Sequence, residues 1–444
     1  MSVRRLAWAC ALLVASAVPL HAAVPTPAAR QEHPIALVGG TVHTVSGAVI
    51  PGGTVLFDRG KITAVGTAPS LPAGTERIDV SGKEVYPGLF DPYSRIGLTE
   101  IDQVRATLDL QEVGNIAPNV RAQVAVNPES ELIPVTRSGG VLVALTAPQA
   151  GLIGGTSAVL MLDGWTWEDM TLAAPVALHI SWPTMTLDHT PSLPDSVHQK
   201  QLEARTKALR DLREAFDEAR AYRTARRSGT SLAPKHPNDQ RWEAMIPVLD
   251  GKLPVIVEAD EIQQIEAAVG FAAQEKVRLI LYGGYDAPKC AELLKRYDVP
   301  VIVSDTHRLP LRRGDPYDDP FTLPERLRQA GIRFCIANGA GAWNERNLPY
   351  GAATAVAYGL PADEGLKAVT LYPAQILGVA DRVGSIGVGK DATLIVTDGD
   401  PLDTNSHVER AFIQGRQIDL NDRQKTLYEK YKEKYRREKS AHSR

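Results

Sequence analysis

Five side chains that could carry acid–base or metal chemistry stand at the ends of apolar runs. They are His179, Glu258, Asp260, Asp305 and His307. Imidazoles and carboxylates transfer protons near neutral pH, and both groups are ligands of zinc and similar cations. Asp305 and His307 are separated by one residue, so in an extended chain they point to the same side. This spacing makes them the catalytic candidates, as an acid/base pair, with an ordinary polar loop as the alternative.

Glu258 and His179 are the candidates for metal ligands, and zinc is the cation that they would take. One histidine does not make a metal site, so the alternative for His179 is a core imidazole with its hydrogen bonds satisfied. The alternative for Glu258 is an ion pair with Arg95, in which the two opposite charges fill the place of a cation. We prefer the ion pair to a metal.

Tyr93 and Arg95 lie in the stretch Pro87-Gly-Leu-Phe-Asp-Pro-Tyr-Ser-Arg-Ile-Gly97. Because they are also one residue apart, they point to the same side of the chain. Arginine has no acceptor lone pair and stays charged, so it cannot bind a cation, and a phenol binds a metal only once it is deprotonated. We therefore assign Tyr93 and Arg95 to a ligand pocket, together with His179, Glu258, Asp260 and Asn338.

Alternating strands and helices in the middle of the chain must position these groups. Predicted strands are 140–145, 157–162, 254–260, 278–284, 299–303 and 333–338, with a further strand ending at His179; predicted helices are 199–227, a segment from 261, and 323–330. This alternation favours an α/β fold with a parallel sheet closed as a (β/α)8 TIM-like barrel. In such a barrel the functional groups lie at the carboxyl ends of the strands.

Short alternating strands at both ends of the chain predict a second, smaller unit. They run over 35–45, 54–57, 61–66 and 77–80 near the start, and over 384–396 and 408–418 near the end. Strand-rich ends on either side of a strand/helix middle indicate that both termini build one β-sandwich. The predicted organisation is a signal peptide (1–23), a flexible lead-in (24–33), a β-sandwich part (34–86), the barrel (87–380), the second sandwich part (381–420) and a basic C-terminal helix (421–444).

The Pro87–Gly97 stretch and a late block resemble the amidohydrolase superfamily, its imidazolonepropionase-like branch especially. The late block comprises residues 347–350, 364–379 and 381–396. The family writes the first stretch Pro-Gly-apolar-apolar-Asp-x-His-x-His. The resemblance implies a (β/α)8 barrel flanked by a sandwich, and a metal-dependent hydrolase of non-peptide carbon–nitrogen bonds, such as those of cyclic amides.

The resemblance also implies where the chemistry should lie, and the sequence departs from it at five strand ends. Tyr93 and Arg95 stand for the two histidines, His179 for a metal-bridging carboxylated lysine, Glu258 and Asp260 for a ligand histidine, Gly283 for a second one, and Asn338 for the catalytic aspartate. We therefore expect a degenerate site without a metal. Such a protein binds a small molecule or supports a related, active amidohydrolase as a subunit. The alternative is an active hydrolase rebuilt from Glu258, His179, Asp305 and His307.

Composition and charge exclude some classes of protein. The 444 residues carry a net charge of -3, which does not suggest a nucleic-acid partner. Arg4 and Arg5 before an apolar segment at 6–18 are typical of a secretory signal, so the expected location is periplasmic or secreted, without a membrane span after processing. Cys290 and Cys335 are expected to be small buried hydrophobes. Homo- and hetero-oligomers both remain open.

The last segment, 423–444, is rich in lysine and arginine and contains Tyr428, Tyr431 and Tyr435. We expect a surface helix that docks its tyrosines on the protein. The alternative is a helix that binds a membrane surface or an acidic partner.

Overall fold

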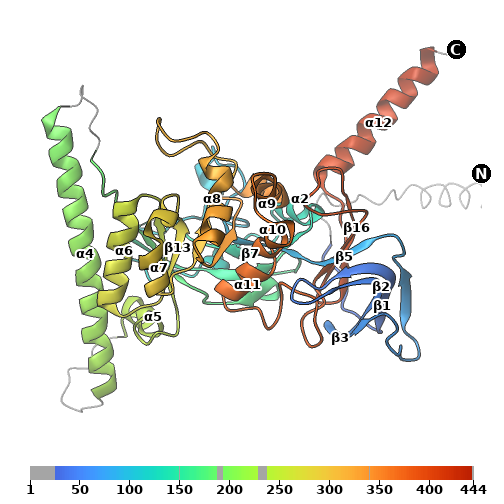
Figure 1. Cartoon of the computed structure of the whole chain (residues 1–444), viewed down its shortest axis with the longest axis horizontal. Helices are drawn as coiled ribbons and strands as arrows, with labels where there is room; N and C mark the ends of the chain where they lie inside the picture. The colour runs from blue at the N-terminus through green and yellow to red at the C-terminus, as the bar shows by residue number, and fades with distance from the viewer. Residues whose placement is uncertain (1–25, 150, 188–193, 229–237, 340, 443–444) are drawn as a thin grey trace, which may run out of the picture.

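The structure is a computed structural model that describes residues 26–149, 151–187, 194–228, 238–339 and 341–442. The predicted signal peptide lies outside these residues. Within them, no helix has the length and apolarity that a membrane crossing needs. The strands form three sheets, and most helices pack against the two central ones (Figure 1).

Strands from both ends of the chain share the first sheet. Its order is β18–β17–β16–β5–β1–β2–β3, and β4 pairs with β1. The bounds are β1 (Ile35–His43), β2 (Val49–Asp58), β3 (Lys61–Gly66), β4 (Glu76–Asp79), β5 (Glu84–Pro87), β16 (Leu394–Thr397), β17 (Val408–Ile413) and β18 (Arg416–Ile418). β16 runs antiparallel to β5, and the backbone N–H of Ile62 on β3 donates to the Lys390 carbonyl at 2.9 Å. The sheet thus wraps around an apolar core that includes Phe57 and Phe412.

The two central sheets carry the strands predicted for the middle region. Their orders are β10–β9–β7–β6 and β15–β14–β13–β12–β11–β8. The bounds are β6 (Leu89–Ser94), β7 (Val141–Thr146), β8 (Ile153–Thr156), β9 (Ala158–Met161), β10 (Thr171–Ala173), β11 (Leu178–Ser181), β12 (Val255–Ala259), β13 (Leu279–Gly283), β14 (Val301–Val303) and β15 (Phe334–Ile336). β6 is parallel to β7, and β11 to β15 are parallel in succession. The mixed α/β class is confirmed, whereas the closed barrel and the sandwich stay predictions.

One predicted strand departs from the parallel pattern. The run 157–162 forms β9, which is antiparallel to β7 rather than parallel to it. A parallel return needs a crossover of a dozen or more residues, usually a helix, and the segment between β7 and β9 is too short for that. Instead the chain turns back through β8, which pairs antiparallel with β11.

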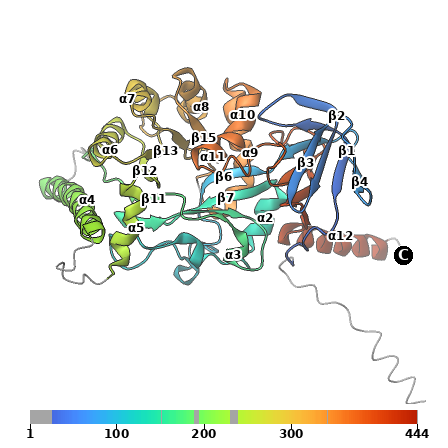
Figure 2. The ribbon, with the colours of Figure 1, turned by 90° about the horizontal axis from the view of Figure 1, so that it is seen from below.

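Helices cover the strands on one side, where α6, α7, α8 and α10 lie in a row (Figure 2). The helix bounds are α2 (Leu132–Ser138), α3 (Trp167–Met170), α4 (Asp195–Ser228), α5 (Gln240–Leu249), α6 (Ile262–Glu275), α7 (Ala291–Arg296), α8 (Asp319–Gln329), α9 (Leu348–Ala357), α10 (Ala362–Ala368), α11 (Leu371–Ile376) and α12 (Arg423–His442). The described residues also contain four 3₁₀ turns: η1 (Arg105–Thr107), η2 (Ala122–Ala125), η3 (Ala287–Cys290) and η4 (Ala342–Asn347).

Helix α6 shows how a sequence signal at the start of a helix determines where the preceding strand ends. Glu261 and Gln264 form a capping box at its start, which satisfies backbone N–H groups that would otherwise lack partners. Its buried residues, Ile265, Ala268 and Ala272 among them, recur at the spacing of one helix face and pack toward β12 and β13. The helix therefore begins directly after β12 and holds the end of that strand in place.

Candidate functional site

A small cavity lies where β6, β11, β12 and β13 end. Its volume is about 170 Å³, and four of the predicted pocket residues line it: Tyr93, Arg95, His179 and Glu258. The other lining residues are Pro148, Gln149, Gly154, Ile180, Ser181, Ile256, Tyr282 and Gly339. Parallel strands present their carboxyl ends at one edge, so side chains far apart in the sequence meet there.

Two tyrosines form one wall of the cavity. The rings of Tyr93 and Tyr282 stack, and the His179 ring lies 5.6 Å from Tyr93 between centroids. Burial raises the pKa of both phenols, so they stay protonated. Sequence reasoning missed Tyr282, because it considered Gly283 at the end of the same strand. The alternation of side chains along β13 would have drawn attention to the neighbouring tyrosine.

His179 is a neutral base in the cavity wall. Its side chain is buried, and desolvation lowers its pKa to about 3. Its Nε2 atom has no hydrogen-bond partner among the described residues. The expected core histidine with satisfied hydrogen bonds is therefore only half right: the ring is buried, but one nitrogen lacks a protein partner.

Glu258 reaches the mouth of the cavity, where it is exposed to solvent. The surrounding walls still remove part of its solvent, and this partial desolvation raises its pKa; the neighbouring Asp260 raises it further, and Arg308 opposes both. The expected ion pair with Arg95 is not among the ion pairs of the described residues. Both groups line the cavity, Glu258 from β12 and Arg95 from the residue that follows β6.

Asp260 and Asn338 were predicted to line the pocket, but neither does. The Asp260 carboxylate accepts hydrogen bonds from the Arg308 guanidinium at 3.0 Å and from the backbone N–H of Tyr285 at 3.1 Å. Asn338 is buried, and its backbone N–H donates to Asp91 at 3.3 Å. The Asp260 carboxylate binds Arg308, which is distant in the sequence, instead of facing the cavity. The backbone of Asn338, just after β15, is hydrogen-bonded to Asp91 on β6.

Asp305 and His307 do not form the predicted acid/base pair. The Asp305 carboxylate accepts from the backbone N–H of His307 at 2.7 Å, whereas the His307 ring contacts Thr354 Oγ1 at 2.6 Å. Neither residue lines the cavity. β14 ends at Val303, so the alternation of an extended strand no longer applies to these positions. The set proposed for a rebuilt enzyme therefore does not converge.

A buried pair of carboxyl groups links β6 to η4. Asp91 and Glu345 are both almost fully buried, and Ser94 Oγ donates to Glu345 Oε1 at 2.5 Å. Burial raises the pKa of Glu345 well above its usual range, and the Asp91 carboxylate raises it further. Glu345 Oε2 has no hydrogen-bond donor among the described residues. A proton on Glu345 that is donated to Asp91 accounts for both observations. Sequence reasoning missed this pair, which no local pattern signals.

The donor set around the cavity does not fit a metal. Only His179 and Glu258 among its lining residues could ligate one, and the described residues contain no group of three or more His, Cys, Asp or Glu that could hold an ion. A catalytic zinc site has three protein ligands. Cys290 and Cys335 are free and buried, as expected.

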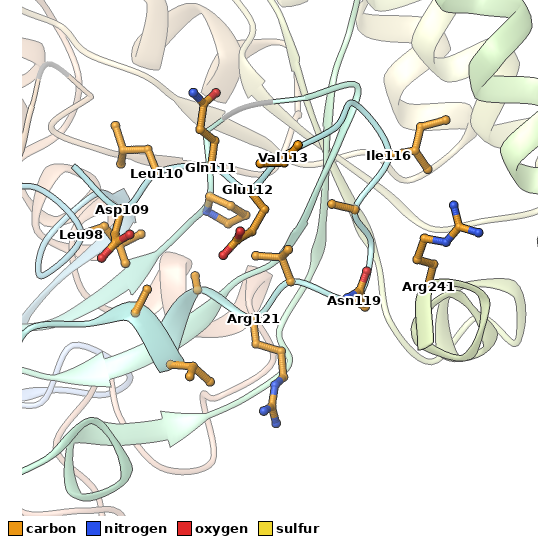
Figure 3. A pocket seen from close by; sticks show the side chains of 16 residues that line it. Leu98, Asp109, Leu110, Gln111, Glu112, Val113, Ile116, Asn119, Arg121 and Arg241 are labelled. Atoms are coloured by element: carbon orange, nitrogen blue, oxygen red, sulfur yellow. The ribbon is translucent and has the colours of Figure 1, made fainter. Parts of the chain in front are cut away.

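A larger hollow lies beside η1 and η2. Its volume is about 560 Å³, and its walls come from Leu98, from residues 109–113, 116, 117, 119–122, 124 and 125, from Pro148 and from Arg241 of α5 (Figure 3). Acidic and basic side chains are mixed in it, among them Glu112 and Arg121. Because these walls hold no buried polar group without a partner among the described residues, we assign the hollow no chemistry.

Comparisons with known proteins show which family this chain is similar to. Residues 301–418, which run from β14 to β18, match the model of the amidohydrolase family. An amidohydrolase from Thermotoga maritima MSB8 has a similar structure, with a TM-score of 0.77 and 26% identity over 87% of this chain and 99% of that one.

Two further proteins are similar to parts of the chain. Amidohydrolase tasK from Hapsidospora irregularis is 25% identical over 388 residues, which are 82% of this chain but only 39% of that longer protein. A prolidase solved with n-methylphosphonate-l-proline has a TM-score of 0.51 at 17% identity over 87% of this chain and 99% of that chain, which shows a shared fold alone. Over residues 301–418 and in its overall fold, the chain is thus similar to amidohydrolases.

Proposed function

We propose that the protein is an amidohydrolase-superfamily barrel protein whose mouth cavity binds a small polar organic molecule without a catalytic metal. One observation carries the proposal: Arg95 and a stacked tyrosine pair line the cavity, where His179 and Glu258 are the only described lining residues that could ligate a metal. We further propose that it descends from the imidazolonepropionase-like branch, with the metal-ligand positions replaced.

The cavity limits the size and charge of the ligand. At about 170 Å³ it is smaller than the 300–1,000 Å³ typical of drug-sized sites, so it fits one small molecule. Arg95 favours a carboxylate or another anionic group, and Glu258 favours a donor. The tyrosine wall favours a flat, partly apolar ring. By analogy with the family, a cyclic amide that carries a carboxylate meets these demands.

The remaining expectations are part of the same proposal. We take the chain to be exported to the periplasm or secreted, with the signal peptide at 1–23, and to comprise a closed (β/α)8 barrel and a sandwich at the boundaries given above. A role as the supporting subunit of a related, active amidohydrolase fits the same site.

Metal analysis of the purified full chain tests the proposal that the cavity holds no metal. We expect well under one equivalent of zinc per chain, and no change in a His179→Ala/Glu258→Ala variant. A matched control, His407→Ala/Glu266→Ala, removes the same residue types from exposed positions. Near-stoichiometric zinc that the first variant loses and the control keeps would show that the proposal is wrong.

Thermal shift with two matched probes tests the ligand class. Pyroglutamate, a cyclic amide with a carboxylate, should raise the melting temperature, whereas pyrrolidone, the same ring without the carboxylate, should not. Arg95→Gln should abolish the shift. Equal shifts with both probes, or a shift that survives Arg95→Gln, contradict the assigned role of Arg95.

The alternative is an active hydrolase with a rebuilt site, for which zinc would be the cofactor. His179 and Glu258 do share the cavity, and burial raises the pKa of Glu258 above its usual value, which is the direction that favours a general acid. Release of glutamate from pyroglutamate, through addition of water across the ring C–N bond, would favour this alternative if Glu258→Gln abolished it. We prefer the binding role, because Asp305 and His307 lie outside the cavity.

A further inference from the structure

Helix α12 projects from the body of the molecule at the C-terminal end (Figures 1 and 2). Its tyrosines are exposed to solvent: 64% for Tyr428, 48% for Tyr431 and 62% for Tyr435. A typical surface helix packs its less polar face on its own core. The expectation that α12 docks its tyrosines on the protein is therefore wrong, and this face is open to a partner.

The exposed rings form one continuous stripe along α12. Tyr428, Tyr431 and Tyr435 follow one another at spacings of three and four residues, which places them on one face of a helix. Leu427, 39% exposed, extends the stripe by one position. We call these four residues the tyrosine stripe.

Lysines border the tyrosine stripe on both sides. Lys432 lies 5.4 Å from the ring centroid of Tyr428, Lys430 lies 6.0 Å from that of Tyr431, and Lys434 lies 5.5 Å from that of Tyr435. At 3.6 residues per turn, Lys432 falls on one side of the stripe and Lys430 and Lys434 fall on the other. Rings and cations thus face the same way.

The carboxylates of α12 point mostly elsewhere. By the same periodicity Glu429 and Glu433 lie off the tyrosine stripe, and Glu438 lies near its end. Glu429 pairs with Lys432 at 3.2 Å and Glu438 with Lys434 at 3.7 Å, but both pairs are exposed to solvent and therefore weak, so an anionic surface can replace them. The helix contains eight lysines and arginines and three glutamates, a formal net charge of +5. In a chain whose net charge is -3, this is a strong local concentration of positive charge.

We propose that α12 binds the surface of an anionic phospholipid membrane through the tyrosine stripe and its flanking lysines. Tyrosine rings favour the water–lipid boundary, and lysines beside them reach the headgroup phosphates. The helix is too polar to cross the membrane, so it lies on the surface. The proposal is independent of the cavity and its ligand.

Two other binding partners match the tyrosine stripe less well than a membrane does. A second copy of α12 would bring two helices of charge +5 together, and like charges repel. A protein interface usually buries about 800 Å² on each partner, more than a stripe of four side chains offers. A flat anionic plane matches a straight stripe with cations along both edges.

Co-sedimentation of the full chain with vesicles tests the proposal. The chain should bind vesicles made of equal parts phosphatidylglycerol and phosphatidylcholine but not pure phosphatidylcholine, and added salt should weaken binding. Lys430→Glu/Lys432→Glu/Lys434→Glu should lower the partition coefficient by about a hundredfold or more. Tyr428→Ser/Tyr431→Ser/Tyr435→Ser should weaken the binding that remains at high salt.

The matched control reverses three exposed basic residues of α4: Lys200→Glu/Lys207→Glu/Arg210→Glu. It changes the net charge by the same amount and should keep vesicle binding. Equal loss in the α12 and α4 variants would mean that only total charge matters, and the proposal would fail. Binding to poly-glutamate without binding to anionic vesicles would identify an acidic protein as the occupant and also overturn it.

Discussion

Tyr93 on β6 and Tyr282 on β13 stack face to face, with ring centroids 3.6 Å apart and ring planes 13° from parallel. The two strands belong to different sheets, so the stack ties the sheets together beneath the mouth cavity. Tyr93 stands where the family resemblance places a metal-binding histidine. Both rings are buried, so they contribute to packing between the sheets as well as forming a wall of the cavity.

The stack predicts a large cost for removing one ring. Tyr282→Ala should lower the free energy of unfolding by about 3–5 kcal/mol, because it leaves a cavity between the sheets. Tyr282→Phe keeps the ring and serves as the matched control, with a much smaller loss. A double-mutant cycle with Tyr93→Ala, measured by urea unfolding, should give a coupling energy of about 0.5–1.5 kcal/mol. A coupling near zero would contradict the stack.

The buried ring of His179 predicts that the folded protein loses stability at acidic pH. Burial lowers its pKa from 6.5 to about 3, so between these values the unfolded chain takes up a proton that the folded chain does not. Stability therefore falls as the pH falls through this window, by about 2 kcal/mol between about pH 7 and pH 5 from this residue.

His179→Gln should remove that part of the pH dependence, as measured by urea unfolding at the two pH values. His407→Gln removes an exposed histidine and should keep the wild-type dependence. If the His179 variant loses as much stability on acidification as the wild type, the ring is not the group that titrates.

Much of the fold could be predicted from local pattern. Apolar runs of strand length gave the positions of β7, β12, β13, β14 and β15, because buried parallel strands are continuously apolar. The strands at the two ends of the chain could be recognised from alternation and glycine-rich turns. The reversal at β9 could not, because chain direction depends on the length and packing of the connection, which a run of apolar residues does not encode.

The site could be predicted only in part, for a related reason. Tyr93, Arg95 and Glu258 stand at or just beyond the carboxyl-end half of a central strand, and His179 lies on the short strand β11 beside β12, so the four side chains meet in one cavity. Asp260 binds Arg308 instead of lining the cavity, and a contact between segments so far apart in the sequence has no local signal. The pairing of Asp91 with Glu345 likewise depends on how η4 packs on β6, which only the folded chain determines.

The shared proton of Glu345 predicts the opposite pH dependence to that of His179. Its folded pKa lies well above 4.5, so above pH 4.5 the folded chain holds a proton that the unfolded chain releases. Stability then falls as the pH rises, by about 1.4 kcal/mol per pH unit until the folded pKa is passed.

Glu345→Gln keeps a donor toward Asp91 and an acceptor for Ser94 but cannot ionise. We expect it to match or exceed the wild-type stability at about pH 8 and to lose the dependence above pH 4.5. Glu409→Gln, at an exposed position, is the control. A Glu345→Gln protein that is much less stable than the wild type at alkaline pH would show that the pair does not share a proton.

The Asp163 carboxylate predicts a strong dependence of stability on one buried ion pair. It accepts from Arg137 of α2 at 2.7 Å, with the two side chains only 1% and 4% exposed, and it also contacts Arg416 of β18 at 3.2 Å. Asp163→Ala leaves the Arg137 charge buried without its carboxylate, so we expect a loss of about 3–5 kcal/mol in urea unfolding. The matched control is Asp217→Ala in the exposed pair with Arg220 on α4, where the loss should stay below about 1 kcal/mol. Similar losses in the two variants would mean that burial does not determine how much the Arg137–Asp163 pair contributes to the free energy of unfolding.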